Sequence, residues 1–484
     1  MVRVRFAPSP TGFLHIGNVR TALFNYLFAK KNKGRFILRI EDTDKERSRP
    51  EFIEQIYEDL HWLGVNWDEG PDIGGEYGPY LQSKRAGLHQ EYVKKLVSEG
   101  NAYECYCTEE ELEALRKEQL ASGQTPRYDN RCRNLTDLEK KAYKDEGRTV
   151  SIRFRMPDEK IFVSDIIRGD VEFDVTLFGD FVIVRPDGSP TFHLAVCVDD
   201  GLMKITHVVR GEDHFSNTPR HVAIFKACGF DVPKFAHMPL TMGPGGEPLS
   251  KRFGAMSIAE YRRAGYLPQA LCNYMSLLGW SSGTDQELFS MGELKSMFTL
   301  ERVVKSAAIF DKVKMDWVSG EHIRAMEDEE YTKACIQHML KEKIVENDEY
   351  RIKPEWYSRV LLLFKNYIRS FGEIKEKLEL FNEEIDYPDI QLIKNEDSFM
   401  VLKYLHVLLR PVENIDEEAF DRIFKELKKK TKQKGKALFM PARIAVSGEE
   451  HGPDLKQVFI LLGKDNCMER IDKAVSLIEE GVSS

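Results

Sequence analysis

The opening forty residues constrain the fold most, because strand, loop, helix and strand follow one another without a break. Residues 2–6 (VRVRF) and 36–40 (FILRI) have the apolar and β-branched residues of short strands. Residues 19–33 between them carry apolar side chains at steps of three and four, which is helical spacing. Such a unit favours a parallel sheet with a right-handed crossover, whose ligands bind at the carboxyl ends of the strands.

A second unit of the same kind begins with a predicted strand at residues 205–209. A loop follows, and then a helix that Ser216 or Asn217 could cap, with Pro219 in its first turn. Between the two units, residues from about 80 to 190 form a long insertion with strand-like pieces, TVSIRFRM and VEFDVT. From about residue 255 onward the chain is mostly helical by period. The order of elements therefore predicts an interrupted α/β domain followed by a helical half.

The composition is that of a globular protein. At 484 residues, and at about 100–200 residues per domain, three or four domains are expected. No apolar run approaches about 18 residues, and no N-terminal signal segment is recognisable, so neither membrane spanning nor secretion is expected. Eight sparse cysteines are typical of reduced thiols in the cytoplasm, which is the location we expect. The net charge of −9 does not indicate nucleic-acid binding, although a local basic face can still bind phosphates.

The loop RFAPSPTGFLHIGN (5–18) holds more special residues than a tight turn needs. Pro8 and Pro10 restrict its backbone, and Gly12 and Gly17 allow close approach or a positive φ. Gly17 stands at the start of the predicted helix, where free N–H groups and the helix dipole favour a phosphate, and His15 could donate to the same group. The alternative is a rigid surface turn with an exposed histidine.

A second candidate for phosphate chemistry is EPLSKRFG (247–254), which follows the glycine-rich MGPGG. Lys251 and Arg252 on such a loop can close over a polyphosphate and stabilise charge at its α-phosphorus. Taken alone, this segment would instead be a basic surface loop.

Together these two segments resemble the signatures of class I aminoacyl-tRNA synthetases, with HIGN (15–18) as the HIGH-type motif and PLSKR (248–252) as the KMSKS-type motif. More narrowly, the chain resembles the bacterial-type glutamyl-tRNA synthetases. The matching stretches include RIEDTD (39–44), PTFHLAVCVDD (190–200), VVRGEDH (208–214), HMPLTM (237–242) and KGKALFMPARIAVSG (434–448). They recur in the family's order and span essentially the whole chain.

The resemblance implies an α/β fold: an N-terminal parallel-sheet Rossmann-like catalytic domain with an inserted acceptor-binding α+β domain, then an all-α C-terminal half. The expected boundaries are 1–80 and 191–250 for the catalytic domain, 81–190 for the insertion, 251–322 for a stem-contact region, and 323–375 and 376–484 for anticodon-binding domains. A monomer is expected.

The implied reaction joins L-glutamate to tRNA(Glu) through a glutamyl-adenylate. ATP, bound with Mg²⁺, supplies the adenylyl group. Glutamate's carboxylate attacks the α-phosphorus, so catalysis rests on positioning and charge stabilisation by His15, Gly17, Lys251 and Arg252. The residues implied to bind ATP are Pro8, His15, Gly17, Asn18, Glu212, Ser250 and Lys251.

The glutamate pocket must hold two carboxylates and one ammonium. Arg5 and Arg210 stand at the ends of predicted strands, and an arginine fork suits a carboxylate. Glu41 at another strand end could pair with the ammonium, and Ser9 could add a hydroxyl contact. Each could instead form an ordinary surface ion pair, but the resemblance favours the pocket, with Phe192 beside it.

Two residues depart from the family pattern. Phe192 stands where the family usually has tyrosine, so a contact from the phenolic hydroxyl is lost while ring packing remains. Pro248 replaces the first lysine of the KMSKS-type motif, so the loop has one cation fewer.

A metal site is suggested within the insertion by Cys105-x-Cys107 and Tyr128-x3-Cys132, because closely spaced thiolates suit tetrahedral Zn²⁺. Many family members show C-x-C…C-x-H, and there the last position falls on Asn134, a poor zinc ligand. Tyr128 is the better candidate for the fourth place, because some relatives show C-x-C…Y-x3-C. The alternative is three free cysteines in a loop-rich subdomain.

The helical half resembles an anticodon-binding cage. Arg443 could reach a base, and the basic run 425–436 would contact the tRNA backbone, unless that run is simply a solvated face. Members that accept only glutamate tRNA often carry an arginine where this chain has Tyr367. Charging of tRNA(Gln) therefore stays open.

Two other functions are alternatives to the one that the resemblance implies. A relative that attaches glutamate to a modified anticodon base lacks the helical half, so the length of 484 residues argues against it. A catalytically weak paralogue that only binds tRNA finds support in Phe192 and Pro248. The paralogue is disfavoured because the signature and pocket residues are intact, namely His15, Gly17, Glu41, Arg210 and Lys251.

Overall fold

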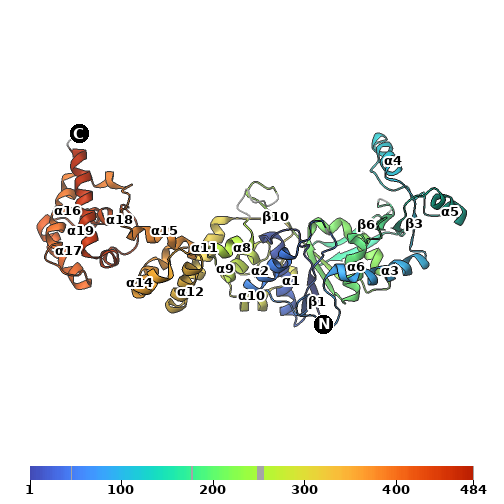
Figure 1. Ribbon diagram of the computed structural model, residues 1–484, viewed down its shortest axis with the longest axis horizontal. Helices are drawn as coiled ribbons and strands as arrows, with labels where there is room; N and C mark the ends of the chain where they lie inside the picture. Colours follow the sequence, from blue (N-terminus) through green and yellow to red (C-terminus); the bar gives the residue numbers. More distant parts are fainter. Residues whose placement is uncertain (45, 176–177, 248–255, 483–484) are drawn as a thin grey trace. The chain divides into compact units, whose positions relative to one another are not determined.

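The structure, a computed structural model, describes residues 1–484 except 45, 176–177, 248–255 and 483–484 (Figure 1). The chain forms two compact units. The first contains Met1–Tyr261 and Pro268–Met315, and the second contains Arg262–Leu267 and Asp316–Ser484. The functional domain boundaries given above, including 251–322 for a stem-contact region, stay predictions.

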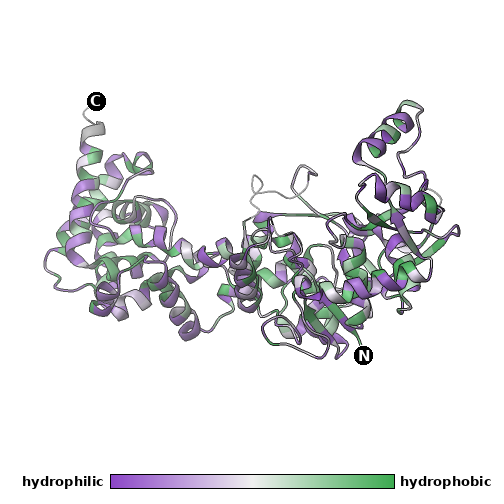
Figure 2. Cartoon of the chain, turned by 45° about the vertical axis from the view of Figure 1, so that its right-hand side comes forward, coloured by the Kyte–Doolittle hydropathy of each residue, from purple (hydrophilic) through white to green (hydrophobic). Residues whose placement is uncertain are grey.

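The first unit contains the parallel strands that the opening residues predict. β1 (Arg3–Phe6) pairs with β2 (Arg35–Leu38), and α1 (Ile16–Lys31) connects them. β8 (His207–Gly211) pairs in parallel with β9 (Lys234–Met238). The Thr206 amide donates to the carbonyl of Arg3 at 2.9 Å, so β1 lies beside β8. Figure 2 shows the strands near the N-terminus in green, the colour of hydrophobic residues.

The sheet also takes in a segment that we expected in the inserted domain. β5 (Ile161–Asp165) pairs in parallel with β9, and β6 (Gly169–Phe173) pairs antiparallel with β5. The segment VEFDVT thus contributes β6 to the sheet that also contains β8 and β9. Periodicity identifies a strand, but it does not identify the strand's neighbour.

The remainder of the insertion builds a separate antiparallel sheet in the order β3 (Ala102–Cys105), β4 (Ser151–Phe154) and β7 (Phe181–Val184). Its helices α4 (Glu109–Ala121) and α5 (Asp137–Asp145) bury none of their residues. Figure 1 shows both helices beyond β3, on the side away from α1.

The other elements of the first unit are mostly helical. α6 (Phe192–Leu202) and α7 (Thr218–Cys228) bury apolar side chains against the sheet, within one core that also includes Val208 and Phe235. Asn217 stands at the N-cap of α7, as expected, but its side chain makes no capping hydrogen bond. The remaining α-helices and strands are α2 (Pro50–Trp62), α3 (Ala86–Ser98), β10 (Thr241–Met242), α9 (Pro268–Leu277), α10 (Met291–Met297) and β11 (Ala308–Ile309). Two further helices, α8 (Ile258–Arg263) and α11 (Lys312–Arg324), contain residues of both units.

The described residues of the second unit form helices joined by turns and loops, and no strand, as the sequence predicts. Its largest core joins the apolar faces of α16 (Glu396–Leu409), α17 (Glu417–Thr431), α18 (Lys436–Ser447) and α19 (Leu455–Val482). α12 (Asp328–Lys341), α13 (Asn347–Ile352), α14 (Pro354–Phe364) and α15 (Ile374–Leu378) precede them. No helix among the described residues is both long and apolar enough to cross a membrane. All eight cysteines are free thiols.

Candidate functional site

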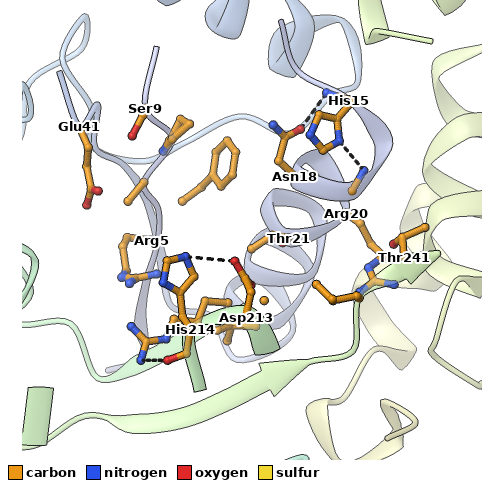
Figure 3. A pocket seen from close by; sticks show the side chains of 18 of the residues that line it. Arg5, Ser9, His15, Asn18, Arg20, Thr21, Glu41, Asp213, His214 and Thr241 are labelled. Carbon is orange, nitrogen blue, oxygen red and sulfur yellow. Dashed lines mark hydrogen bonds and ion pairs between the residues drawn. The ribbon is translucent and has the colours of Figure 1, made fainter. Parts of the chain in front are cut away.

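A cavity of about 610 Å³ opens at the carboxyl ends of β1 and β8, next to the first turn of α1 (Figure 3). Nine residues singled out from the sequence line it together: Arg5, Pro8, Ser9, His15, Gly17, Asn18, Glu41, Phe192 and Arg210. Pro248, Ser250, Lys251 and Arg252 lie outside the described residues. The sheet therefore gathers at one point side chains that are up to about two hundred positions apart in the chain, as ligand binding at strand ends requires.

The first turn of α1 is held by the signature residues themselves. His15 is the N-cap, and its Nδ1 accepts a hydrogen bond from the amide of Gly17 at 3.2 Å. Asn18 Oδ1 in turn accepts from the amide of His15 at 2.8 Å. A Cβ on Gly17 would lie 3.2 Å from the imidazole, so a glycine lets the ring approach the backbone.

This capping changes the expected role of the turn. The N–H of Gly17, which we expected to be free for a phosphate, is occupied by the imidazole. Because Nδ1 accepts, a neutral His15 carries its proton on Nε2, which remains as a donor. Desolvation lowers the pKa of His15, which favours this neutral form. The histidine is therefore oriented by its own helix.

Two residues that sequence reasoning missed, Arg39 and Asp200, organise the base of the cavity. Asp200 Oδ1 accepts from Arg5 Nε at 3.1 Å and from Arg39 Nη1 at 2.6 Å. Arg39 Nη2 donates to Glu41 Oε1 at 3.1 Å, and all four side chains are buried. The terminal nitrogens of Arg5 have no hydrogen-bond partner among the described residues. Asp200 therefore fixes the guanidinium through Nε alone, and both terminal nitrogens can donate to a ligand.

Glu41 lies in this cluster with its charge under opposing influences. Burial raises its pKa, whereas Arg39 and Arg5 lower it, and the net direction is upward. Only Oε1 is engaged with Arg39 in the structure, so Oε2 is available to a cation. A ligand ammonium there would stabilise the ionised carboxylate.

Arg210 is buried without contacting a carboxylate. Its three nitrogens donate to neutral acceptors: His237 Nε2 at 3.0 Å, His221 Nδ1 at 3.1 Å, Thr218 Oγ1 at 2.9 Å and the carbonyl of His214 at 3.2 Å. Burial lowers the pKa of Arg210 to about 10, and the neighbouring charge of Arg5 acts in the same direction. Arg5, Arg39 and Arg210 thus lie among three carboxylates, those of Asp200, Glu41 and Asp213, and none of the three carboxylates hydrogen-bonds to Arg210.

Arg20 of α1 is a further buried cation on the cavity wall, and it is not among the residues expected from the sequence. Its guanidinium donates to the carbonyl of Leu278 at 3.0 Å and to that of Pro239. Burial lowers its pKa to about 10. The sequence does contain one sign that Arg20 is buried, because this arginine stands among the apolar residues of a predicted helix (VRTALFNYLFA).

Two residues that the resemblance implied take different positions. Phe192 lines the cavity with 39% of its surface exposed, and its ring centroid lies 5.4 Å from that of His214. Glu212 is not among the lining residues. Its carboxylate contacts Arg168 and accepts from the amide of Leu240 at 2.9 Å, which gives it a local structural partner on each oxygen.

The predicted metal residues also come together. The sulfur atoms of Cys105, Cys107 and Cys132 all lie within 4.8 Å of one another. Tyr128 Oη is 3.5 Å from Cys105 Sγ and 3.6 Å from Cys107 Sγ, and Cys107 Sγ is 3.5 Å from Cys132 Sγ. Bonds of about 2.3 Å to sulfur and 2.0 Å to oxygen in a tetrahedron give ligand separations of about 3.5–3.8 Å. The cluster therefore fits a tetrahedral ion.

Two hydrogen-bond donors, the side chain of Arg153 and the amide of Cys132, lie against this cluster. Arg153 Nε donates to Cys105 Sγ at 3.1 Å, and its guanidinium carbon lies 3.7 Å from the centroid of the Tyr128 ring. The amide of Cys132 donates to Tyr128 Oη at 3.1 Å. Hydrogen bonds with Cys107 and Cys132, together with the charge of Arg153, lower the pKa of the Cys105 thiol, whereas hydrogen bonds with Cys105 and Cys132 raise the pKa of Cys107 and burial raises that of Tyr128.

In the second unit, Tyr367 and Arg443 line one crevice of about 790 Å³. Both reach the same loop: Tyr367 Oη donates to the carbonyl of Gly452 at 3.3 Å, and Arg443 Nη1 to that of Pro453 at 2.9 Å. The basic run ends α17 with Lys428, Lys429 and Lys430. Two residues singled out separately by motif thus share one site.

Comparison with known proteins identifies similar chains over the full length. A family model described as class I tRNA synthetases (E and Q), catalytic domain, matches residues 1–317, and an anticodon binding domain model matches 321–475. Glutamate–tRNA ligase 1 of Caldicellulosiruptor saccharolyticus is 46% identical over 97% of this chain and 98% of its own length. Glutamate–tRNA ligase of Carboxydothermus hydrogenoformans is 45% identical over 97% and 99%. A crystal structure of a glutamate tRNA ligase from Elizabethkingia meningosepticum in complex with its amino acid has a TM-score of 0.88 at 35% identity, covering 99% of both chains.

Proposed function

The chain belongs to the glutamate–tRNA ligases, class I synthetases that join glutamate to tRNA at the expense of ATP, and we propose that the cavity between β1, β8 and α1 is where it activates glutamate. The observation that carries this proposal is the pairing of two buried arginines, Arg5 and Arg210, with one carboxylate, Glu41, in a single cavity. Glutamate presents two carboxylates and one ammonium, which is the complementary set.

The two arginines are suited to different degrees of contact. Arg5 keeps both terminal nitrogens for a bidentate pair with a carboxylate. Arg210 has five N–H donors, of which four hydrogen bonds to protein take up four, so one donor on Nη1 is left. Glu41 Oε2 accepts the ammonium. Ser9 and Phe192 complete the wall around the bound side chain.

The chemical step needs no protein nucleophile. Glutamate's α-carboxylate attacks the α-phosphorus of ATP, the bond to pyrophosphate breaks, and glutamyl-adenylate forms. His15 Nε2 and the first turn of α1 bind phosphate oxygens and orient them, which is catalysis by positioning and by charge. Lys251 and Arg252 add positive charge as the α-phosphorus becomes crowded. Mg²⁺ enters bound to the phosphates of ATP and needs no protein cage of its own.

The thiol cluster is proposed as a structural Zn²⁺ site. Cys105, Cys107, Cys132 and Tyr128 would hold the ion, and Arg153 would offset part of the negative charge of the ligands. Bound zinc would tie strand β3 to the loop at 128–132. It lies away from the cavity in sequence, and it takes no part in the reaction.

The crevice that holds Tyr367 and Arg443 is proposed as the pocket for an anticodon base. Tyrosine offers a ring for stacking and arginine offers planar donors, which are the two means by which proteins read unstacked RNA bases. Lysines at the end of α17 would contact the backbone beside it.

Aminoacylation with labelled glutamate on purified tRNA(Glu) and tRNA(Gln) tests the function and its range together. Charging of tRNA(Glu) is the expected result, and charging of tRNA(Gln) decides the question that Tyr367 raises. A purified chain that binds tRNA but charges neither would refute the ligase and favour the paralogue that only binds.

A further inference from the structure

Behind the glutamate cavity, five side chains from five elements form one hydrogen-bonded row. It runs Asp165 (β5), His237 (β9), Arg210 (β8), His221 (α7) and His193 (α6). The contacts along it are His237 Nδ1 to Asp165 Oδ2 at 2.6 Å, Arg210 Nε to His237 Nε2 at 3.0 Å, Arg210 Nη1 to His221 Nδ1 at 3.1 Å and His221 Nε2 to His193 Nδ1 at 3.1 Å. All members except His193 are buried.

The arginine decides where each proton in this row lies. A guanidinium only donates, so His237 Nε2 and His221 Nδ1 must both be acceptors. His237 is therefore the Nδ1–H tautomer, which donates to Asp165, and His221 is the Nε2–H tautomer, which donates to His193. Neither histidine can become an imidazolium without breaking its bond to Arg210.

The surroundings of the row also hold both histidines neutral. Burial lowers the pKa of His221 well below its ordinary value, and Arg210, His193, His214 and Arg5 act in the same direction. For His237, burial and the charge of Arg210 outweigh the attraction of Asp165, and the pKa is again lowered. Burial lowers the pKa of His193 to about 4. The charges of Asp200 and Asp213 act on Arg210 in the opposite direction and raise its pKa, but neither carboxylate outweighs burial.

We propose that His221 and His237 are positioning residues for glutamate recognition, which hold Arg210 in place as neutral acceptors and so leave its positive charge for the substrate carboxylate. A carboxylate in either position would hold the guanidinium equally well, but it would cancel that charge. The carboxylate of the row, Asp165, is kept one imidazole away from Arg210. The inference rests on the proposed glutamate site.

Two matched substitutions at His221 separate geometry from charge. Asn and Asp have the same shape, and either places an acceptor oxygen near the position of Nδ1, but only Asp brings a negative charge. His221→Asn should keep the KM for glutamate within about threefold of the original value. His221→Asp and His221→Leu should each raise it about tenfold or more, the usual effect of losing a hydrogen bond or a free charge at an ionised group. The KM for ATP should change little in all three variants.

A control and a direct readout complete the experiment. His207 stands at the other end of β8, outside the cavity lining, so His207→Gln should leave both KM values unchanged. Nitrogen-15 chemical shifts of the histidine rings should show His221 protonated on Nε2 and His237 on Nδ1.

Each outcome bears on one idea. Equal glutamate KM values for the Asn and Asp variants, or opposite tautomers, would overturn the proposal. A parallel rise of both KM values with a lower melting temperature in every His221 variant would reduce the row to a structural role and overturn it too. An unsubstituted protein that does not activate glutamate at all would instead refute the proposed function.

Discussion

Replacing Arg5 should damage the use of glutamate while sparing ATP. The side chain is 5% exposed and is held by its Nε against Asp200, so its two terminal nitrogens are directed by the protein before a ligand arrives. Arg5→Ala removes a buried, charge-assisted pair with the substrate carboxylate. Loss of such a pair costs about 2–5 kcal/mol, which corresponds to about 30-fold to several thousand-fold in kcat/KM for glutamate.

The same reasoning predicts how glutamine is treated. Its amide would present N–H donors to the donors of Arg5 and would leave a buried charge unpaired, so discrimination by about 10⁴-fold is attainable without editing. Phe192 lacks the phenolic hydroxyl that the family usually has, and any weakening of this discrimination would be traced there. We expect no useful activation of free glutamine.

Pyrophosphate exchange in the presence of tRNA, run with glutamate and with glutamine, measures both effects. Arg3→Ala is the matched control, because Arg3 is a buried arginine on the same strand, paired with Glu69 at 2.7 Å and absent from the cavity lining. Arg5→Ala should cost no more thermal stability than Arg3→Ala, because Asp200 keeps Arg39 at 2.6 Å. Glutamate kinetics that are alike in the two variants, or comparable exchange with glutamine, would refute this reading of the pocket.

Further predictions concern the remaining parts of the molecule. Lys251→Ala should lower adenylate formation by orders of magnitude with a smaller effect on glutamate binding, since its charge acts mostly in the transition state; rapid-quench kinetics would show near-normal turnover if this is wrong. Elemental analysis should find about one zinc per chain, and Cys132→Ser should lose it, whereas zinc-free protein with unchanged melting would favour free cysteines. Arg443→Ala should weaken charging through the KM for tRNA and leave tRNA-independent ATP binding intact, and an unchanged KM for tRNA would exclude the crevice. Melting temperature should fall as the pH drops below about 6.5, because the unfolded chain takes up protons on His221 and the folded one does not; His221→Asn should flatten that slope, and a parallel curve would contradict it.

Local pattern was sufficient for much of the fold and for the choice of candidate residues. The period of two in VRVRF and the helical spacing after it predicted β1 and α1, because these depend on near neighbours along the chain. The strand-end rule brought Arg5, Glu41 and Arg210 to one place, and thiol spacing selected the cysteine cluster. The helical second half also followed from period alone.

Only the tertiary structure decided which strands pair and what each charged side chain contacts. β5 and β6 lie in the part of the sequence expected to form the insertion, yet they pair into the sheet of β8 and β9. Strand pairing depends on partners far away in the chain, which a local pattern does not show. The N–H of Gly17 was expected to be free, but the imidazole of His15 folds back onto it. Asp200, Arg39, His221 and His237 went unnoticed because a buried ionisable residue looks the same in a sequence as an exposed one. Its burial, its partners and therefore its charge state are set by segments that meet only when the chain folds.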